Sequence, residues 1–148
     1  MISAATLTCV ISMLGITGGT EVTSDSAVLR LEGGQYACSA VHVAPAMALT
    51  AAHCLGPDLR VFSRASDAGI AITHTRAHPL FGPSGLADLA VLTLETPSTA
   101  PVMPWASALE ANQAVTLTGW GRTETGTTAG LREAHNQVAR VRSSQFTV

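Results

Sequence analysis

The sequence contains no lysine: all eight basic residues are arginines, and ten acidic residues leave a net charge of −2. The arginines are scattered along the chain, so they create no basic patch that would attract nucleic acid. Charged residues make up only 12% of the sequence and hydrophobic residues 47%. This composition is typical of a globular chain rather than a disordered one, and we expect no nucleic-acid partner.

The sequence also lacks an apolar stretch long enough to cross a membrane. Residues 1–15 are uncharged and mostly apolar, but a membrane-spanning helix needs about 20 such residues. The segment resembles a secretory signal peptide without the usual basic beginning. We therefore expect residues 1–15 to be removed and no membrane anchor to remain; an uncleaved apolar strand is the alternative.

Cysteines are few, and their spacing does not favour a metal site. Cys9, Cys38 and Cys54 make an odd count, and the close Cys-x-x-Cys pairs of a structural zinc site are absent. His74 and His78 are four apart, but the threonines and proline around them favour strand and loop over a metal-binding helix face. Phosphate loops, dinucleotide fingerprints and EF-hand loops are missing too. We expect no cofactor and no metal.

Short β-type runs separated by turn signals dominate the chain, and no long segment has the apolar period of a helix. The sequence therefore predicts an all-β protein. The expected strands of its first part are residues 27–31, 36–43, 46–50, 59–63, 70–75 and 89–94. Six such strands suit an antiparallel β-barrel, which closes on itself and leaves no exposed edge.

The following part of the chain begins with a connector. Residues 97–104 hold three prolines, too many for a central strand. A helical turn over 106–111 and strands over 114–118 and 131–141 are expected next. We place a boundary near Trp105, so that residues 16–104 form the first barrel and residues 105–148 a connector with the opening strands of a second.

The most informative stretch is Leu49–Cys54, in which a histidine follows two alanines and precedes a cysteine. The small alanines leave the imidazole of His53 uncrowded. This stretch resembles the histidine motif of the trypsin-like, chymotrypsin-fold serine endopeptidases. In that family the histidine is a general base and lies beside a disulfide, which here would join Cys38 to Cys54. Such a pairing fits an oxidising compartment, so the resemblance implies a secreted protein.

Further matches occur in the order that the family has them. Asp88 begins a segment similar to the family's aspartate strand, 35 residues after His53. The others are Ile16–Thr20, similar to the mature amino terminus that begins at Ile16, His78–Phe81, similar to the loop before the aspartate, and Thr118–Thr123, similar to a Gly-Trp-Gly turn. The resemblance thus extends over roughly residues 16–141 and implies two barrels packed face to face.

The resemblance assigns roles to two side chains. His53 would be the general base, because an imidazole with an ordinary pKa of about 6.5 can both accept and return a proton. Asp88 would hold that ring in one tautomer and stabilise its cation. The family's substrates are polypeptides, cleaved through an acyl-enzyme. Taken alone, Asp88 is equally well an ordinary turn residue.

One required element is missing: the sequence contains no Gly-Asp-Ser-Gly-Gly-Pro turn to supply the nucleophilic serine. Ser84, in a turn-rich loop, and Ser143 and Ser144, in a polar tail, are far better explained as solvated residues. We therefore expect a truncated chain that is inactive alone, with a partner or the missing half packing on the first barrel. The alternative is a noncatalytic single-barrel binding protein or pseudopeptidase.

The remaining histidines and Trp120 are expected to have no part in catalysis. His42 lies within an apolar strand and is expected to be a packed or edge residue rather than a ligand, whereas His135 is expected to face solvent. Trp120 stands between two glycines, which favours packing in a tight turn over contact with a substrate.

Overall fold

The structure, a computed structural model, describes residues 16, 19–33, 36–64, 68–82, 87–106, 108–121, 130–141 and 146–147. Its strands are β1 Thr20–Glu21, β2 Val28–Gly33, β3 Tyr36–Ala44, β4 Met47–Thr50, β5 Arg60–Phe62, β6 Ile70–Ala77, β7 Ala90–Leu94, β8 Ala114–Gly119, β9 Arg132–Gln137, β10 Arg140–Val141 and β11 Phe146–Thr147. A single 3-10 turn, η1 Ala52–Cys54, is the only helical element among these residues. No described helix is long and apolar enough to span a membrane.

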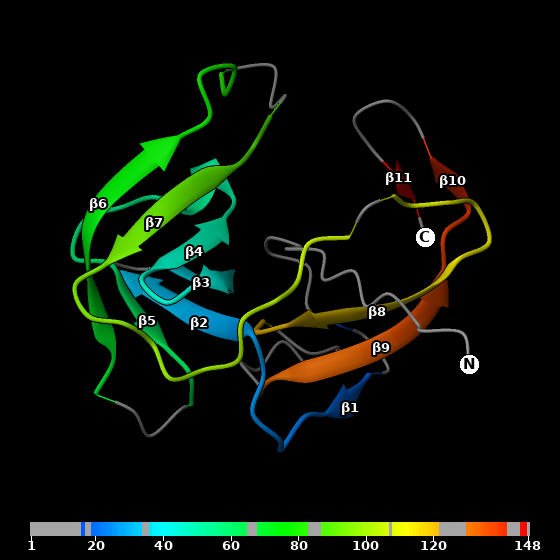
Figure 1. Cartoon of the computed structure of the whole chain (residues 1–148), viewed down its shortest axis with the longest axis horizontal. Coiled ribbons are helices and arrows are strands. Elements are labelled where there is room, and N and C mark those ends of the chain that lie inside the picture. Colours follow the sequence, from blue (N-terminus) through cyan, green and yellow to red (C-terminus); the bar gives the residue numbers. More distant parts are fainter. Residues whose placement is uncertain are drawn as a thin grey trace.

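Six strands close into an antiparallel barrel in the order β2-β3-β4-β7-β6-β5, which occupies the left of Figure 1. The all-β class and the six-stranded barrel expected from the sequence are confirmed, with strand ends within two residues of their expected positions. The barrel closes because β2 pairs with β3 on one side and with β5 on the other, with Leu31 opposite both Cys38 and Val61.

Alternation of side chains along the strands builds the barrel's core. In β7, residues Ala90, Leu92 and Leu94 are buried while the two between them are half-buried. A strand with period-two alternation presents one face to the interior. The core cluster is Leu29, Leu31, Cys38, Ala40, Ala48, Ala51, Cys54, Leu59, Val61, Leu92 and Leu94.

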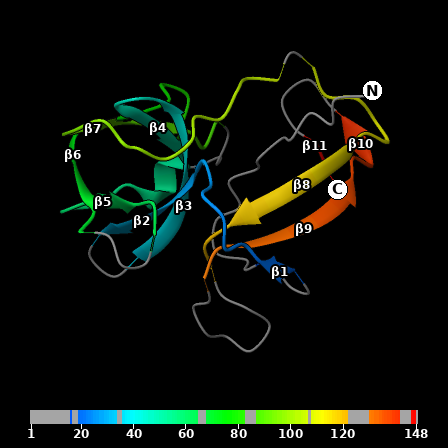
Figure 2. The same ribbon diagram turned by 60° about the horizontal axis from the view of Figure 1, so that its bottom comes forward.

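A second sheet of three strands, β1-β9-β8, lies beside the barrel (Figures 1 and 2). Strand β8 confirms the expected strand over 114–118, but the long strand expected over 131–141 is split into β9 and β10. The split occurs at Val138, which is fully buried and exchanges backbone hydrogen bonds with Asn112 and Gln113 instead of continuing the ladder. A short pair, β10 with β11, follows.

Strand β1 was not expected. It joins the second sheet, with Thr20 opposite Glu133, so the beginning of the described chain runs along the second sheet. The arginine side chain of Arg132 donates a hydrogen bond to the backbone oxygen of Gly19, and Val22 N–H donates to Leu131 O at 2.8 Å. The boundary near Trp105 stays a prediction.

The helical turn expected over 106–111 is wrong for the residues described there. A tight turn forms slightly later, where Gln113 N–H donates to Glu110 O at 3.2 Å. Asn112 adopts a φ of 65°. Asparagine tolerates this left-handed conformation better than most residues, and a residue in that conformation cannot continue a right-handed helix. Residues 1–15, including Cys9, lie outside the described part of the chain.

Candidate active site

Strand pairing brings the two predicted catalytic side chains to one end of the barrel. Strands β4 and β7 are antiparallel, with Thr50 opposite Ala90. His53 follows Thr50 by three residues and Asp88 precedes Ala90 by two, so both leave the sheet at the same end. The pairing of β4 with β7 thus brings His53 and Asp88 together, which their separation in the sequence alone does not guarantee.

Small residues shape the turn that carries His53. Ala51 and Ala52, at the beginning of the turn, are buried, and Cys54 N–H donates to Ala51 O at 3.0 Å to form the 3-10 turn. On the facing segment, Ala87 adopts a φ of 53°. A left-handed alanine carries a steric cost, and here it redirects the chain immediately before Asp88.

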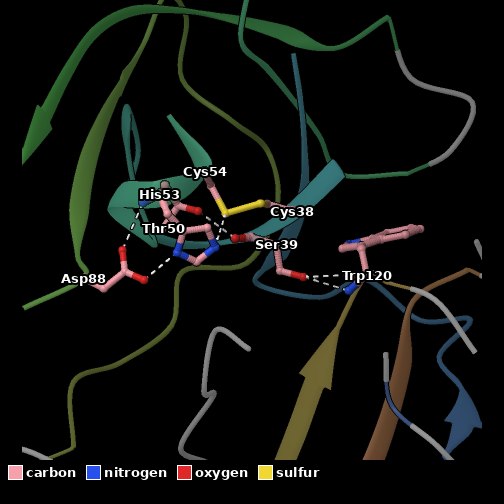
Figure 3. The surroundings of a disulfide bond; sticks show 7 residues. All are labelled: Cys38, Ser39, Thr50, His53, Cys54, Asp88 and Trp120. Atoms are coloured by element: carbon pink, nitrogen blue, oxygen red, sulfur yellow. Dashed lines mark hydrogen bonds and ion pairs between the residues drawn. A yellow bond between two sulfur atoms is a disulfide. The ribbon is translucent and has the colours of Figure 1, made fainter. Parts of the chain in front are cut away.

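His53 and Asp88 form two hydrogen bonds, drawn at the left of Figure 3. His53 Nδ1 lies 2.5 Å from Asp88 Oδ2, and the backbone N–H of His53 donates to Asp88 Oδ1 at 3.0 Å. An ionised carboxylate only accepts hydrogen bonds, so the ring proton lies on Nδ1 and the lone pair of the neutral ring lies on Nε2. The predicted contact between the two side chains is confirmed.

The carboxylate is held in its ionised form. Partial burial raises the pKa of Asp88, but the hydrogen bonds from the side chain and backbone of His53 and its charge lower the pKa by more, and the net result is below the ordinary value of 3.8. The side chains remain accessible, at 35% exposed for His53 and 32% for Asp88. A reacting group could therefore approach the ring.

A disulfide joins Cys38 on β3 to Cys54 beside His53, as predicted (Figure 3). Cys54 Sγ lies 3.5 Å from His53 Nε2. Both cysteines are buried in the barrel core. Although their sulfur atoms and the His53 ring lie close together, cysteines in a disulfide have no thiolate to bind a metal.

The structure places the other candidate residues as follows. His42 is buried, as expected of a packed residue, and His135 faces solvent. His74 and His78 are exposed, and neither belongs to a metal-binding group among the described residues. Ile16 is half-buried. Ser84, Ser143 and Ser144 lie outside the described residues.

Sequence reasoning missed the hydrogen-bond partners of three buried polar residues of the barrel. Thr50 is fully buried and its hydroxyl donates to Ser39 O at 2.9 Å, which ties β4 to β3 just before the His53 turn. The Ser39 side chain reaches Trp120 beyond the end of β8. His42 Nδ1 lies 3.0 Å from both Ala100 O and Pro101 O. The signal that could have found the three residues themselves is a polar residue at a strand position whose neighbours are apolar.

Comparison with known proteins identifies the family. The sequence profile described as trypsin matches residues 16–145. The chain belongs to the trypsin family. Two solved structures share the trypsin-family fold: neuropsin, "a serine protease expressed in the limbic system of mouse brain", at 22% identity with a TM-score of 0.72, and a structure titled "Structure of GrC", at 23% identity with a TM-score of 0.73.

The extent of these matches is partial. Each covers 84% of this chain and 66% of the solved chain, so this chain spans slightly less than two thirds of the length of these trypsin-fold structures. No curated protein sequence matches the chain. At such identities the solved structures show the fold, and the family comes from the profile match.

Proposed function

We propose that this chain is the base-bearing part of a secreted serine endopeptidase, with His53 as general base and Asp88 as its orienting acid. The observation that carries the proposal is the pair of hydrogen bonds between them, in a chain that belongs to the trypsin family. The proposed substrates are polypeptides. The Cys38–Cys54 disulfide supports an oxidising, extracellular location.

The geometry supports a defined proton route. Asp88 keeps the ring proton on Nδ1, so the lone pair on Nε2 is available to take the proton of a serine hydroxyl as that hydroxyl attacks a peptide carbonyl. The resulting imidazolium would be stabilised by the Asp88 carboxylate, and Nε2 would then return the proton to the leaving amine. Asp88 accepts hydrogen bonds from both the ring and the backbone N–H of His53, which limits rotation of the imidazole.

Hydrolysis also requires a nucleophile and donors that stabilise the oxyanion. The sequence contains no Gly-Asp-Ser-Gly-Gly-Pro turn, so in this proposal the serine belongs to polypeptide beyond these 148 residues, either continuous with them or in a partner. The isolated chain would then have a base with nothing to activate, and its hydrolysis rate would be that of the uncatalysed reaction. Ile16 is proposed as the mature amino terminus.

The test uses a fluorophosphonate probe, which labels an activated serine. We expect the 148-residue chain to remain unlabelled, and the natural polypeptide, sequenced past residue 148, to contain the serine turn and to be labelled unless His53 is changed to alanine. Stoichiometric labelling of the 148-residue chain itself, lost in H53A, would contradict the absence of a nucleophile. If the natural polypeptide contains no such serine, the proposed peptidase function is wrong and a noncatalytic binding protein takes its place.

A further inference from the structure

One buried hydroxyl links the barrel to the second sheet at their junction. Ser39 lies on β3 and is 2% exposed. Its Oγ accepts a hydrogen bond from the backbone N–H of Trp120 at 2.8 Å and donates one to Trp120 O at 3.2 Å (Figure 3). The two residues are 81 positions apart in the chain. One hydroxyl therefore satisfies both backbone groups of a residue in the other half of the molecule.

The backbone around Ser39 cannot replace this contact. Ser39 is paired with Arg30 in the ladder between β2 and β3, and its carbonyl accepts the Thr50 hydroxyl. Trp120 directly follows Gly119, the last residue of β8, so the ladder with β9 does not reach it. Trp120 is half-buried, a backbone group shielded from water needs a partner, and the Ser39 side chain supplies that partner here.

The turn that carries Trp120 is built to approach β3 closely. A Cβ added to Gly119 would lie 3.3 Å from Ser39 Oγ, so glycine allows the approach at that position. The indole Nε1 of Trp120 donates to Val28 O on β2 at 3.0 Å. The guanidinium of Arg30 is in cation–π contact with two rings, 4.9 Å from the centre of Phe62 and 5.7 Å from that of Trp120.

We propose that Ser39 is a positioning residue that fixes the Gly119–Trp120 turn, and with it the end of β8 in the second sheet, relative to His53. Ser39 follows Cys38, and Cys38 is joined by the disulfide to Cys54, the neighbour of His53. The hydroxyl thus belongs to the same rigid piece of β3 that anchors the His53 turn. This role of Ser39, the placement of the second sheet against the barrel, goes beyond the proposed catalysis. It does not depend on whether the chain is part of a peptidase.

Hydrogen exchange followed by NMR tests this role on the 148-residue chain. In Ser39→Ala we expect the Trp120 amide to exchange roughly tenfold faster or more, since its acceptor is lost, while amides paired between β4 and β7 keep their protection. Ser39→Thr retains the hydroxyl and should restore slow exchange. The matched control is Ser98→Ala, because the Ser98 hydroxyl accepts from nearby Ala100 N–H, away from Trp120, and its loss should leave Trp120 unchanged.

A spectroscopic readout isolates the same residue. The chain has two tryptophans, so Trp105→Phe leaves Trp120 as the only one. Trp105 is 76% exposed, so this substitution should disturb the fold little. In that background Ser39→Ala should shift the emission of Trp120 to longer wavelength, and Ser39→Thr should not. Unchanged Trp120 exchange in Ser39→Ala would overturn the proposal. Equal loss of protection throughout the barrel, or failure of Ser39→Ala to fold, would also overturn it, because the hydroxyl would then support the whole fold rather than the junction.

Discussion

The barrel and the second sheet differ in how completely each buries its side chains. Five of the six barrel strands contribute buried residues to one core cluster, Ile70 and Ile72 of β6 pack against it, and Leu29, Leu31 and Leu92 are among its most deeply buried members. In the second sheet β9 shows no fully buried residue, and β8 shows only Val115 and Thr118. A closed barrel satisfies its own strand edges, whereas an open sheet leaves an edge unpaired. The difference explains how the barrel can hold His53 and Asp88 without help from the second sheet.

The largest expected effect comes from emptying the barrel core. Leu92→Ala should lower the free energy of unfolding by about 2–5 kcal/mol, because a fully buried leucine leaves a cavity. Leu117→Ala, in half-buried β8, should cost less than about 2 kcal/mol. Urea unfolding of both variants measures the difference. Equal losses in the two variants would mean that the second sheet is as well packed as the barrel.

Removal of the disulfide should follow in size. The bridge closes a separation of 16 residues, and the double variant Cys38→Ala/Cys54→Ala should lose about 3 kcal/mol in the chain-entropy estimate. The loss should fall on the barrel, so exchange in β8 and β9 should rise no more than in β4 and β7. Unfolding in urea gives the total, and hydrogen exchange gives its distribution; a loss confined to the second sheet would contradict this assignment.

A smaller effect is expected at the connector between the two regions. His42→Leu removes the ring hydrogen bonds to Ala100 O and Pro101 O and should cost about 1 kcal/mol. Exposed His74 on β6 offers the matched control, and His74→Leu should change stability little. Thermal unfolding compares the two. If the two variants lose equal stability, His42 does not hold the connector.

These comparisons also show which features the sequence could predict. The six barrel strands were predictable because alternating residues and Gly or Pro turns are local signals, and the stretch around His53 resembles a known family motif. The pairing of β1 with β9 was not predictable, since it joins residues more than a hundred positions apart with only two residues in β1. Ser39 and His42 stand out in the sequence as polar residues at apolar strand positions, but their contacts at the junction were missed because the partners are backbone groups, which no pattern of side chains reveals.

The smallest effect is the acid dependence that Asp88 adds to stability. Its pKa in the folded chain is below the ordinary value of 3.8, so the folded state binds this proton less readily than the unfolded state. The stability it contributes is therefore present above pH 3.8 and is lost as the pH falls through the lower folded pKa. The free energy of unfolding, measured from neutral to acidic pH, should fall less steeply below pH 3.8 in Asp88→Asn than in the original chain. If the free energy of unfolding falls equally steeply at acidic pH in both chains, the lowered pKa of Asp88 is contradicted.

The most direct test of the site is the proton between His53 Nδ1 and Asp88 Oδ2, observed by NMR in the 148-residue chain. A short bond to a carboxylate shifts such a proton far downfield of ordinary amides, and the 2.5 Å separation predicts a resonance there. It should vanish in both His53→Ala and Asp88→Asn and should persist in Leu117→Ala, which disturbs only the second sheet. A chain without this resonance, or one that keeps it in Asp88→Asn, would contradict the claim that the barrel alone assembles the pair.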